Sequence, residues 1–210
     1  MRAELCGEAI RLTEMLCEYE AAGTPATEAL AALMYLHAAR LPARIDAAGD
    51  LSALLDQDRS RWDTGLMMSG LGHFERSAAG AELTPYHIEA AIAAVHAAAP
   101  AVETTDWTAI VALYDRLMDI APSPVIALNR AIAIAQRDGA QRGLEELRAI
   151  ADRERLSGYP FYPAALGELE LRRGNREAAR AHVEAALALA RNAPERRFLE
   201  GQLRRCGNPG

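Results

Sequence analysis

The stretch PFYPAALGELELRRGNREAARAHVEAALALARNA, residues 160–193, decides the fold. It carries small or slender side chains at successive spacings of seven, five, four and three residues: Gly167, Gly174, Ala179, Val183 and Ala186. Small side chains at these spacings let two antiparallel helices approach closely, and Gly174-Asn175 supplies a turn between them. The stretch therefore predicts a tightly packed helical hairpin.

The same spacing resembles the tetratricopeptide repeat, a pair of antiparallel helices with a period of about 34 residues. A looser copy precedes it, and helix pairs led by proline begin at Pro124 and Pro160. The matching positions of the looser copy are Ala131, Gly143, Leu147 and Ile150. Repeats of this kind stack into solenoids whose concave surfaces bind segments of other proteins. By this resemblance, the sequence predicts an interaction module built from a degenerate repeat array.

The rest of the chain also has helical periodicity. Three helices are predicted to start with a capping residue followed by proline, at Thr24-Pro25, Thr84-Pro85 and Ser123-Pro124. Over residues 3–21 the apolar groups fall on one side of a helix. They are Leu5, Ala9, Leu12, Leu16 and Tyr19. We expect about ten helices and no strand, that is, an all-α fold of antiparallel helix pairs stacked as a degenerate tetratricopeptide-like solenoid.

The short, proline-marked connections favour one helical domain over residues 1–210. Within it, we expect N-terminal helix pairs over residues 1–100, with a charged connector at 41–63. Residues 101–210 are expected to hold the tetratricopeptide-like repeats.

Composition and charge exclude several classes of protein. Half of the residues are hydrophobic but only 5% are aromatic, and the net charge is −6. An acidic chain is a poor stand-alone nucleic-acid binder, because phosphate neutralisation supplies most of that affinity. The three cysteines, Cys6, Cys17 and Cys206, form no C-x-x-C motif, which favours a reduced, cytoplasmic protein. The N-terminus has no apolar signal-peptide region, and no apolar run reaches membrane-spanning length.

The stretch LDQDRSRWD, residues 55–63, is the main candidate site. It sets alternating charges around a tryptophan, which favours either an internal ion-pair clasp between two helical hairpins or a site that grips a partner or ligand. Other polar and aromatic residues join it as candidates for partner or ligand binding. The full set is Arg44, Asp56, Asp58, Arg59, Arg61, Trp62, Asp63, His96, Asp106, Trp107, Asn129 and Arg130.

No catalytic motif is present: H-E-x-x-H, G-x-S-x-G, Walker A and G-x-G-x-x-G are all absent. The five histidines are scattered, and none has a cysteine or a second histidine at a metal-ligand spacing. We therefore expect no enzyme, no cofactor and no metal. One acid–base alternative combines His96, Asp106 and Tyr114 across a helix pair.

Six blocks of sequence, in order, resemble one known domain. They are EAIRL (8–12), LMYLHAAR (33–40), QDRSRWD (57–63), AAIAAVHA (90–97), PSPVIALNRA (122–131) and ERRFL (195–199). The domain is the C-terminal, tetratricopeptide-like extension of a group of bacterial extracytoplasmic-function RNA polymerase sigma factors. The resemblance covers nearly the whole chain.

The resemblance implies a regulatory module that modulates transcription initiation. Its implied partners are the N-terminal regions of the sigma factor and the RNA polymerase core, and small YCII-like proteins are further candidates. The promoter-reading regions of the family have no counterpart here, so no direct DNA binding by this chain alone is expected. The alternative function is a small-ligand-sensing or catalytic domain with a pocket near Arg59, Trp62, His96 and Trp107.

Overall fold

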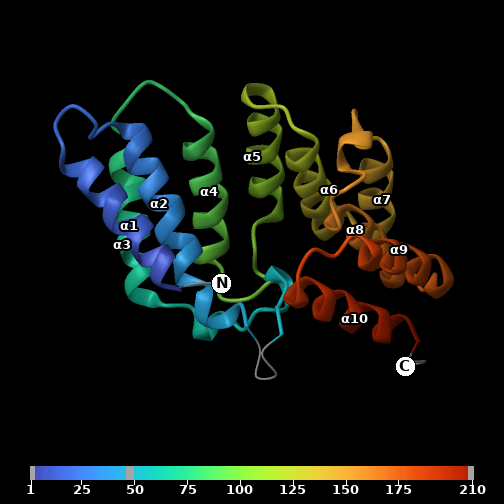
Figure 1. Cartoon of the computed structure of the whole chain (residues 1–210). Helices are drawn as coiled ribbons and strands as arrows, with labels where there is room; N and C mark the ends of the chain where they lie inside the picture. The colour runs from blue at the N-terminus through green and yellow to red at the C-terminus, as the bar shows by residue number, and fades with distance from the viewer. Residues whose placement is uncertain (1–2, 46–49, 208–210) are drawn as a thin grey trace. The chain divides into compact units, whose positions relative to one another are not determined.

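The computed structural model describes residues 3–45 and 50–207, and within these ranges its regular elements are all helices, with no strand. The ten α-helices of the described ranges are α1 Ala3–Glu18, α2 Pro25–Ala39, α3 Thr64–Ser77, α4 Pro85–Ala98, α5 Trp107–Ile120, α6 Pro124–Asp138, α7 Ala140–Arg148, α8 Phe161–Arg172, α9 Arg176–Ala188 and α10 Ala193–Gly207. Four short 3₁₀ helices join them: η1 Leu41–Ala43, η2 Leu54–Asp56, η3 Arg59–Arg61 and η4 Arg153–Leu156. The predicted all-α helical-repeat fold is confirmed (Figure 1).

The chain divides into two compact units. The N-terminal unit comprises residues 1–45 and 52–121, and the C-terminal unit comprises residues 46–51 and 122–210. Helix α5 packs on α4 and so belongs to the N-terminal unit. The boundary therefore lies at residue 121, whereas the sequence indicated a division at residue 100. No helix in the described ranges is long and apolar enough to cross a membrane.

The predicted helix starts are present in the structure. The Thr24 hydroxyl accepts a hydrogen bond from the Thr27 amide at 3.2 Å, and the Ser123 hydroxyl accepts one from the Val125 amide at 3.2 Å. Thr84 caps α4 together with His87. Proline stands at the start of α2, α4 and α6, where its missing N–H costs nothing.

In the C-terminal unit, α6 pairs with α7 and α8 pairs with α9. Glycines sit where these helices touch. Gly167 packs so closely on α9 that a Cβ there would lie 2.7 Å from Val183 Cγ2. Gly174 turns the chain between α8 and α9 with φ +80°. The hairpin predicted from residues 160–193 is thus present, and its small residues lie at the helix contact.

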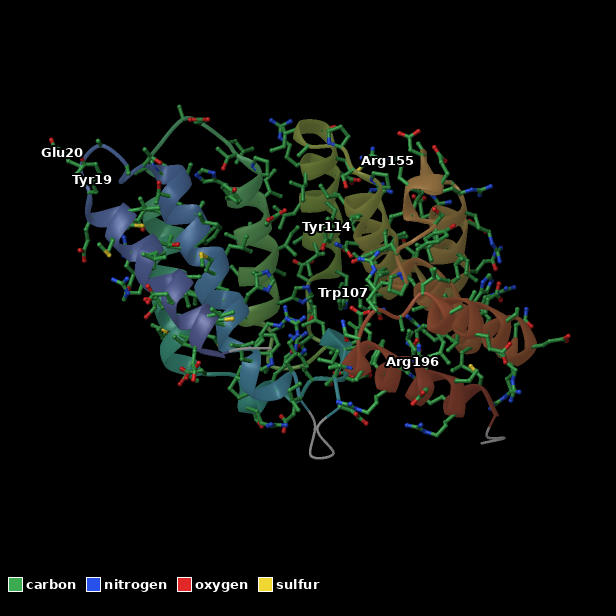
Figure 2. The ribbon with its side chains drawn as sticks, in the orientation of Figure 1. Tyr19, Glu20, Trp107, Tyr114, Arg155 and Arg196 are labelled. Carbon is green, nitrogen blue, oxygen red and sulfur yellow. The ribbon has the colours of Figure 1, made fainter. Side chains whose placement is uncertain are left out.

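Helix α1 presents its apolar side to solvent. Leu5 and Leu12 are 61% and 49% exposed, and Tyr19 directly after the helix is 65% exposed (Figure 2). Met15 and Leu16 share this side by helical spacing, and both are exposed. These five residues are called the α1 apolar face below. The helix packs on α2 through its neighbouring side instead, where Thr13 is buried.

Candidate functional site

Two of the three acidic residues of the 55–63 stretch, Asp58 and Asp63, act as helix caps. Asp58 Oδ1 accepts hydrogen bonds from the amide and hydroxyl of Ser60, at 3.0 and 2.6 Å, and so starts η3. Asp63 Oδ1 accepts from the Leu66 amide at 2.9 Å and starts α3. The hydrogen bonds from Ser60, with a smaller contribution from the charge of Arg61, lower the pKa of the Asp58 carboxyl. Local backbone donors therefore hold these carboxylates in place.

Arg59 joins this stretch to α4 and α5. Its Nη1 donates to the backbone carbonyls of His96, at 3.0 Å, and Ala99, at 2.8 Å, where α4 ends. Its Nη2 donates to Thr105 Oγ1 at 3.0 Å, just before α5 begins. A cation at a helix C-terminus also interacts favourably with the helix dipole. The planar guanidinium thus fixes the end of one helix and the approach to the next.

The predicted ion-pair clasp is wrong in its chemistry, because the arginines of this stretch bind backbone carbonyls and a hydroxyl rather than its carboxylates. Among the described residues, none of Asp56, Asp58 and Asp63 forms an ion pair with Arg59 or Arg61. Arg61 is exposed, and it donates to the backbone carbonyls of Pro42 and Ile45. Asp56 is exposed as well. Two of the carboxylates accept hydrogen bonds from backbone amides at helix starts, and the guanidinium groups donate to backbone carbonyls.

Trp62 lies against two arginines. The ring is 5% exposed, and Cζ of Arg40 and Cζ of Arg59 lie 5.5 and 5.3 Å from its centroid, within cation–π range. The amide of the next residue, Asp63, donates to the Ala39 carbonyl at 2.8 Å, which ties the stretch to the end of α2. Trp62 is therefore a packing anchor between the end of α2 and η3, through Arg40, Arg59 and the neighbouring backbone contact.

The surroundings of Trp62 are strongly cationic. Burial, and then the positive charges of Arg59 and Arg40, with a smaller contribution from the neighbouring His37, lower the pKa of His96 to about 4. Burial, and then the charges of Arg44 and Arg59, lower the pKa of Arg40 to about 10. We call the three arginines Arg40, Arg44 and Arg59, together with the neutral imidazoles of His37 and His96 beside them, the cationic cluster. Its excess of positive charge suits an anion.

Three polar atoms near the cationic cluster are buried with no hydrogen-bond partner in the described structure: Arg59 Nε, Trp62 Nε1 and His96 Nδ1. The His96 ring meets Trp107 edge-on, with centroids 5.4 Å apart and planes at 72°. Buried polar groups usually have a hydrogen-bond partner, so these three atoms mark a place where hydrogen-bonding capacity is left unused.

The described structure shows no hydrogen bond that would support the acid–base alternative of His96, Asp106 and Tyr114. The Asp106 carboxylate accepts from the Ala109 amide at 2.9 Å and caps α5. Trp107 opens that helix, and its indole donates to the Val102 carbonyl at 3.3 Å. Burial raises the pKa of Tyr114, on α5, to about 12 (Figure 2). Within the described ranges, no hydrogen bond links His96, Asp106 and Tyr114.

Two of the predicted site residues lie in the other unit. Asn129 and Arg130 are on α6, and Arg130 Nη1 pairs with Glu146 Oε2 at 2.7 Å, which ties α6 to α7. Arg44 belongs to the N-terminal unit, is exposed, and accepts through its carbonyl a hydrogen bond from the Ser52 amide at 2.9 Å. The structure thus groups Arg59, Trp62, His96 and Trp107 within one unit.

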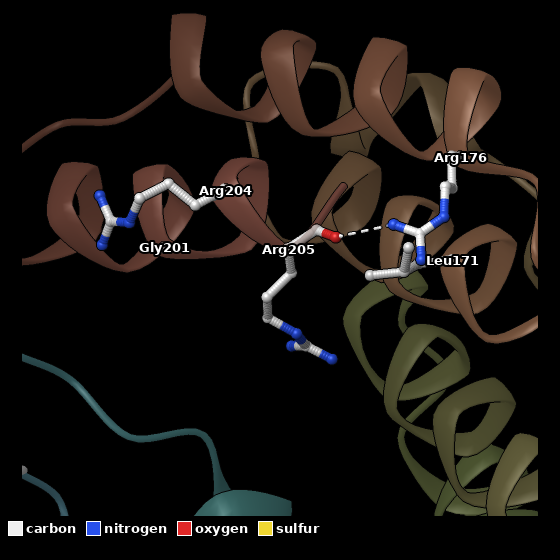
Figure 3. Close-up of a pocket in the computed structure, with 5 residues that line it drawn as sticks. All are labelled: Leu171, Arg176, Gly201, Arg204 and Arg205. Atoms are coloured by element: carbon white, nitrogen blue, oxygen red, sulfur yellow. Dashed lines mark hydrogen bonds between the residues drawn. The ribbon is translucent and has the colours of Figure 1, made fainter. Parts of the chain in front are cut away.

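Two further arrangements had no signal in the sequence. Cys17, Glu28 and His73 come from three helices of the N-terminal unit, and their ligand atoms all lie within 4.8 Å of one another. In the C-terminal unit, a cavity of about 590 Å³ is lined by Leu171, Gly201 and three arginines (Figure 3). The arginines are Arg176, Arg204 and Arg205, and Arg176 Nη1 donates to the Arg205 carbonyl at 3.3 Å.

Acidification is expected to destabilise the N-terminal unit through His96. Its pKa is about 4 in the folded chain against an ordinary value of 6.5. Between these values the unfolded chain binds more protons, so the free energy of unfolding falls as the pH drops from 6.5 to 4. The difference between the two pKa values corresponds to about 3 kcal/mol. Urea unfolding at pH 7 and pH 4.5 measures this loss.

The His96→Gln variant carries no titrating group at this position, so it should lose correspondingly less stability over the same pH interval. Carboxylates elsewhere contribute to acid sensitivity equally in both proteins and cancel in the comparison. An identical loss in the variant and the original chain would contradict the assignment to His96.

Comparisons with known proteins place the chain beside relatives without an assigned activity. Residues 1–78 match the model of a family described as a family of unknown function, DUF6596. An uncharacterized protein of Rhizobium meliloti (strain 1021), R00370, is 40% identical over 201 residues. The match covers 96% of this chain and 47% of that relative. The chain therefore spans about half the length of the curated relative it matches.

Proposed function

We propose that this chain is a regulatory protein-interaction domain of an extracytoplasmic-function sigma factor. It packs on the sigma regions, on RNA polymerase or on a partner protein, and thereby modulates transcription initiation in the cytoplasm. It catalyses no reaction, and promoter binding is left to the sigma regions because the chain itself is acidic. The ordered resemblance of six blocks supports the family, and the α1 apolar face supports the mode of action.

The α1 apolar face is the observation that carries the proposal. Five large apolar residues gather on one side of a helix and all are about half exposed or more. Isolated exposed apolar residues are normal, but a contiguous apolar patch on a protein surface is typical of an interaction site. An apolar helix face of this kind matches the helix-in-groove mode of recognition.

The occupant that we propose for this face is the pair of promoter-reading sigma regions. The curated relative is about twice as long as this chain, so a polypeptide of sufficient size accompanies the matched region in that protein. Covering a helix face of five large residues would remove apolar area from water, which is favourable at roughly 25 cal/mol per Å².

Binding between the purified chain and the sigma regions, supplied as a separate polypeptide, tests the proposal. The double variant Leu12→Glu/Leu16→Glu places two charges in the centre of the α1 apolar face. We expect it to weaken binding by about 100-fold, since central apolar residues dominate such interfaces. The matched control is Met68→Glu/Leu83→Glu, which changes two exposed apolar residues of the same unit away from α1 and should bind like the original chain.

Three outcomes would count against the proposal in different ways. Equal binding by both double variants would show that the α1 apolar face is not part of the interface. Binding to polymerase or to a YCII-like protein, but not to the sigma regions, would show that the sigma regions are not the partner that this face binds. An original chain that binds none of the three would overturn the regulatory function.

The cationic cluster favours a second candidate function, the sensing of a small anionic ligand near Arg59, Trp62, His96 and Trp107. Neither Arg40 nor Arg59 forms an ion pair within the described residues, so the charge is available to a ligand. Inorganic phosphate and acetate should then raise the melting temperature of the original chain but not that of Arg40→Met. An equal rise in both proteins, or none in either, would set this candidate aside.

A further inference from the structure

Three potential metal ligands converge in the N-terminal unit, and none of them belongs to the cationic cluster or to the α1 apolar face. Cys17 comes from α1, Glu28 from α2 and His73 from α3. Their sulfur, oxygen and nitrogen atoms lie within 4.8 Å of one another. The side chains of His73 and Glu28 are only 11% and 17% exposed, so both are held largely inside the protein.

The surrounding residues fix the orientation of His73. Tyr35 stacks on the imidazole, with centroids 5.2 Å apart and planes at 18°, and Tyr35 itself is buried. Gly70, one turn earlier on α3, lies so close to Leu36 that a Cβ there would be 2.8 Å from Leu36 Cγ. The ring is therefore held by packing between α2 and α3, as a preorganised ligand requires.

The hydrogen bonds at His73 Nδ1 conflict with each other. This nitrogen lies 2.7 Å from Glu28 Oε2 and also 2.7 Å from Arg76 Nη2. In any one tautomer it can donate to the carboxylate or accept from the guanidinium, but not both. When Nδ1 carries its lone pair, that lone pair faces a carboxylate oxygen, and a cation between the two atoms removes the repulsion.

Arg76 supplies that positive charge in the structure. Its Nε lies 3.0 Å from Glu28 Oε2, yet the side chain is 55% exposed and so can move into solvent without leaving a buried charge behind. The guanidinium thus stands where a compact cation would sit.

We propose that Cys17, Glu28 and His73 bind a divalent transition-metal ion. Zn²⁺ suits this donor set, because it accepts thiolate, imidazole and carboxylate ligands in tetrahedral geometry. Three protein ligands leave a fourth position for water. The ion displaces the Arg76 guanidinium from His73 Nδ1 and from the Glu28 carboxylate. Because one ligand comes from each helix, the bound ion links α1 to α2 and α3. The proposal is independent of the proposed regulatory function.

Cobalt and zinc titrations of the full chain test this site. Co²⁺ bound by Cys17 should give thiolate-to-cobalt charge-transfer absorption with one equivalent of metal, and Zn²⁺ should displace it. Cys17→Ser should abolish this absorption, and His73→Gln should weaken Zn²⁺ binding at least about tenfold, since each ligand contributes strongly. Cys6→Ser changes the other cysteine of α1 and is the matched control, expected to behave like the original chain.

A fourth variant tests the competition with the guanidinium. Arg76→Met removes a cation beside the ligands and should bind Zn²⁺ severalfold more tightly than the original chain. Far-UV circular dichroism shows whether each variant keeps its helices. No charge-transfer absorption in the original chain, or absorption that survives in Cys17→Ser and vanishes in Cys6→Ser, would overturn the proposal.

Discussion

Replacing Arg59 with methionine is expected to lower the stability of the N-terminal unit by about 4 kcal/mol. Hydrogen bonds from a charged donor typically contribute about 1.5–3 kcal/mol each, and each buried polar group left unpaired costs about 1–3 kcal/mol. The substitution removes three hydrogen bonds, to the carbonyls of His96 and Ala99 and to the Thr105 hydroxyl. It also removes one of the two cations packed on Trp62.

Arg61→Met is the matched control. It lies two residues away in the same 3₁₀ helix, but its guanidinium is exposed and, among the described residues, donates to the carbonyls of Pro42 and Ile45. Surface substitutions of this kind change stability by about 0.5 kcal/mol or less. Urea unfolding of both variants, followed by tryptophan fluorescence, gives the two values. An Arg59→Met variant as stable as Arg61→Met would show that the Arg59 hydrogen bonds do not hold α4 and α5.

Replacing Gly143 with leucine is expected to destabilise the C-terminal unit by about 4 kcal/mol. Even a Cβ at this position would lie 2.3 Å from Ala135 Cβ and 2.9 Å from Leu169 Cδ1. The clashing atoms include Cα and Cβ of Ala135, which cannot move unless the backbone of α6 moves. Helices α6 and α7 must therefore move apart to admit a side chain. Leucine is a better helix former than glycine by about 0.5–1 kcal/mol, so local propensity alone predicts the opposite sign.

Gly158→Ala provides the comparison, because a Cβ there would meet nothing within 4 Å. We expect it to change stability by about 0.5 kcal/mol or less. Hydrogen exchange of the α6 and α7 amides separates the two outcomes. Unchanged protection in Gly143→Leu would mean that the close approach of these helices contributes little to stability.

Much of the fold is encoded in local signals that a single sequence displays. Caps and prolines set the starts of α2, α4 and α6, and the spacing of Gly167, Val183 and their neighbours gives the α8–α9 hairpin. These features depend on residues close together in the chain, where backbone geometry leaves few alternatives.

The candidate site could be predicted only in part. The sequence identified Arg59 and Trp62 as important, but not that Arg59 binds backbone carbonyls, since every residue has a carbonyl and none is marked as an acceptor. Amphipathic spacing located the apolar side of α1 without telling whether it meets this chain or a partner. Cys17, Glu28 and His73 lie on three helices, so no spacing rule could group them.

The placement of Trp62 and Trp107 gives the molecule an internal optical reporter. They are the two tryptophans of the chain, and both lie in the N-terminal unit beside Arg59 or His96. Intrinsic indole emission therefore senses release of the Arg59 hydrogen bonds and is silent about unfolding of the tetratricopeptide-like helices, which carry tyrosines instead. Comparing emission with circular dichroism in one denaturation series would resolve whether the two units melt together or in sequence.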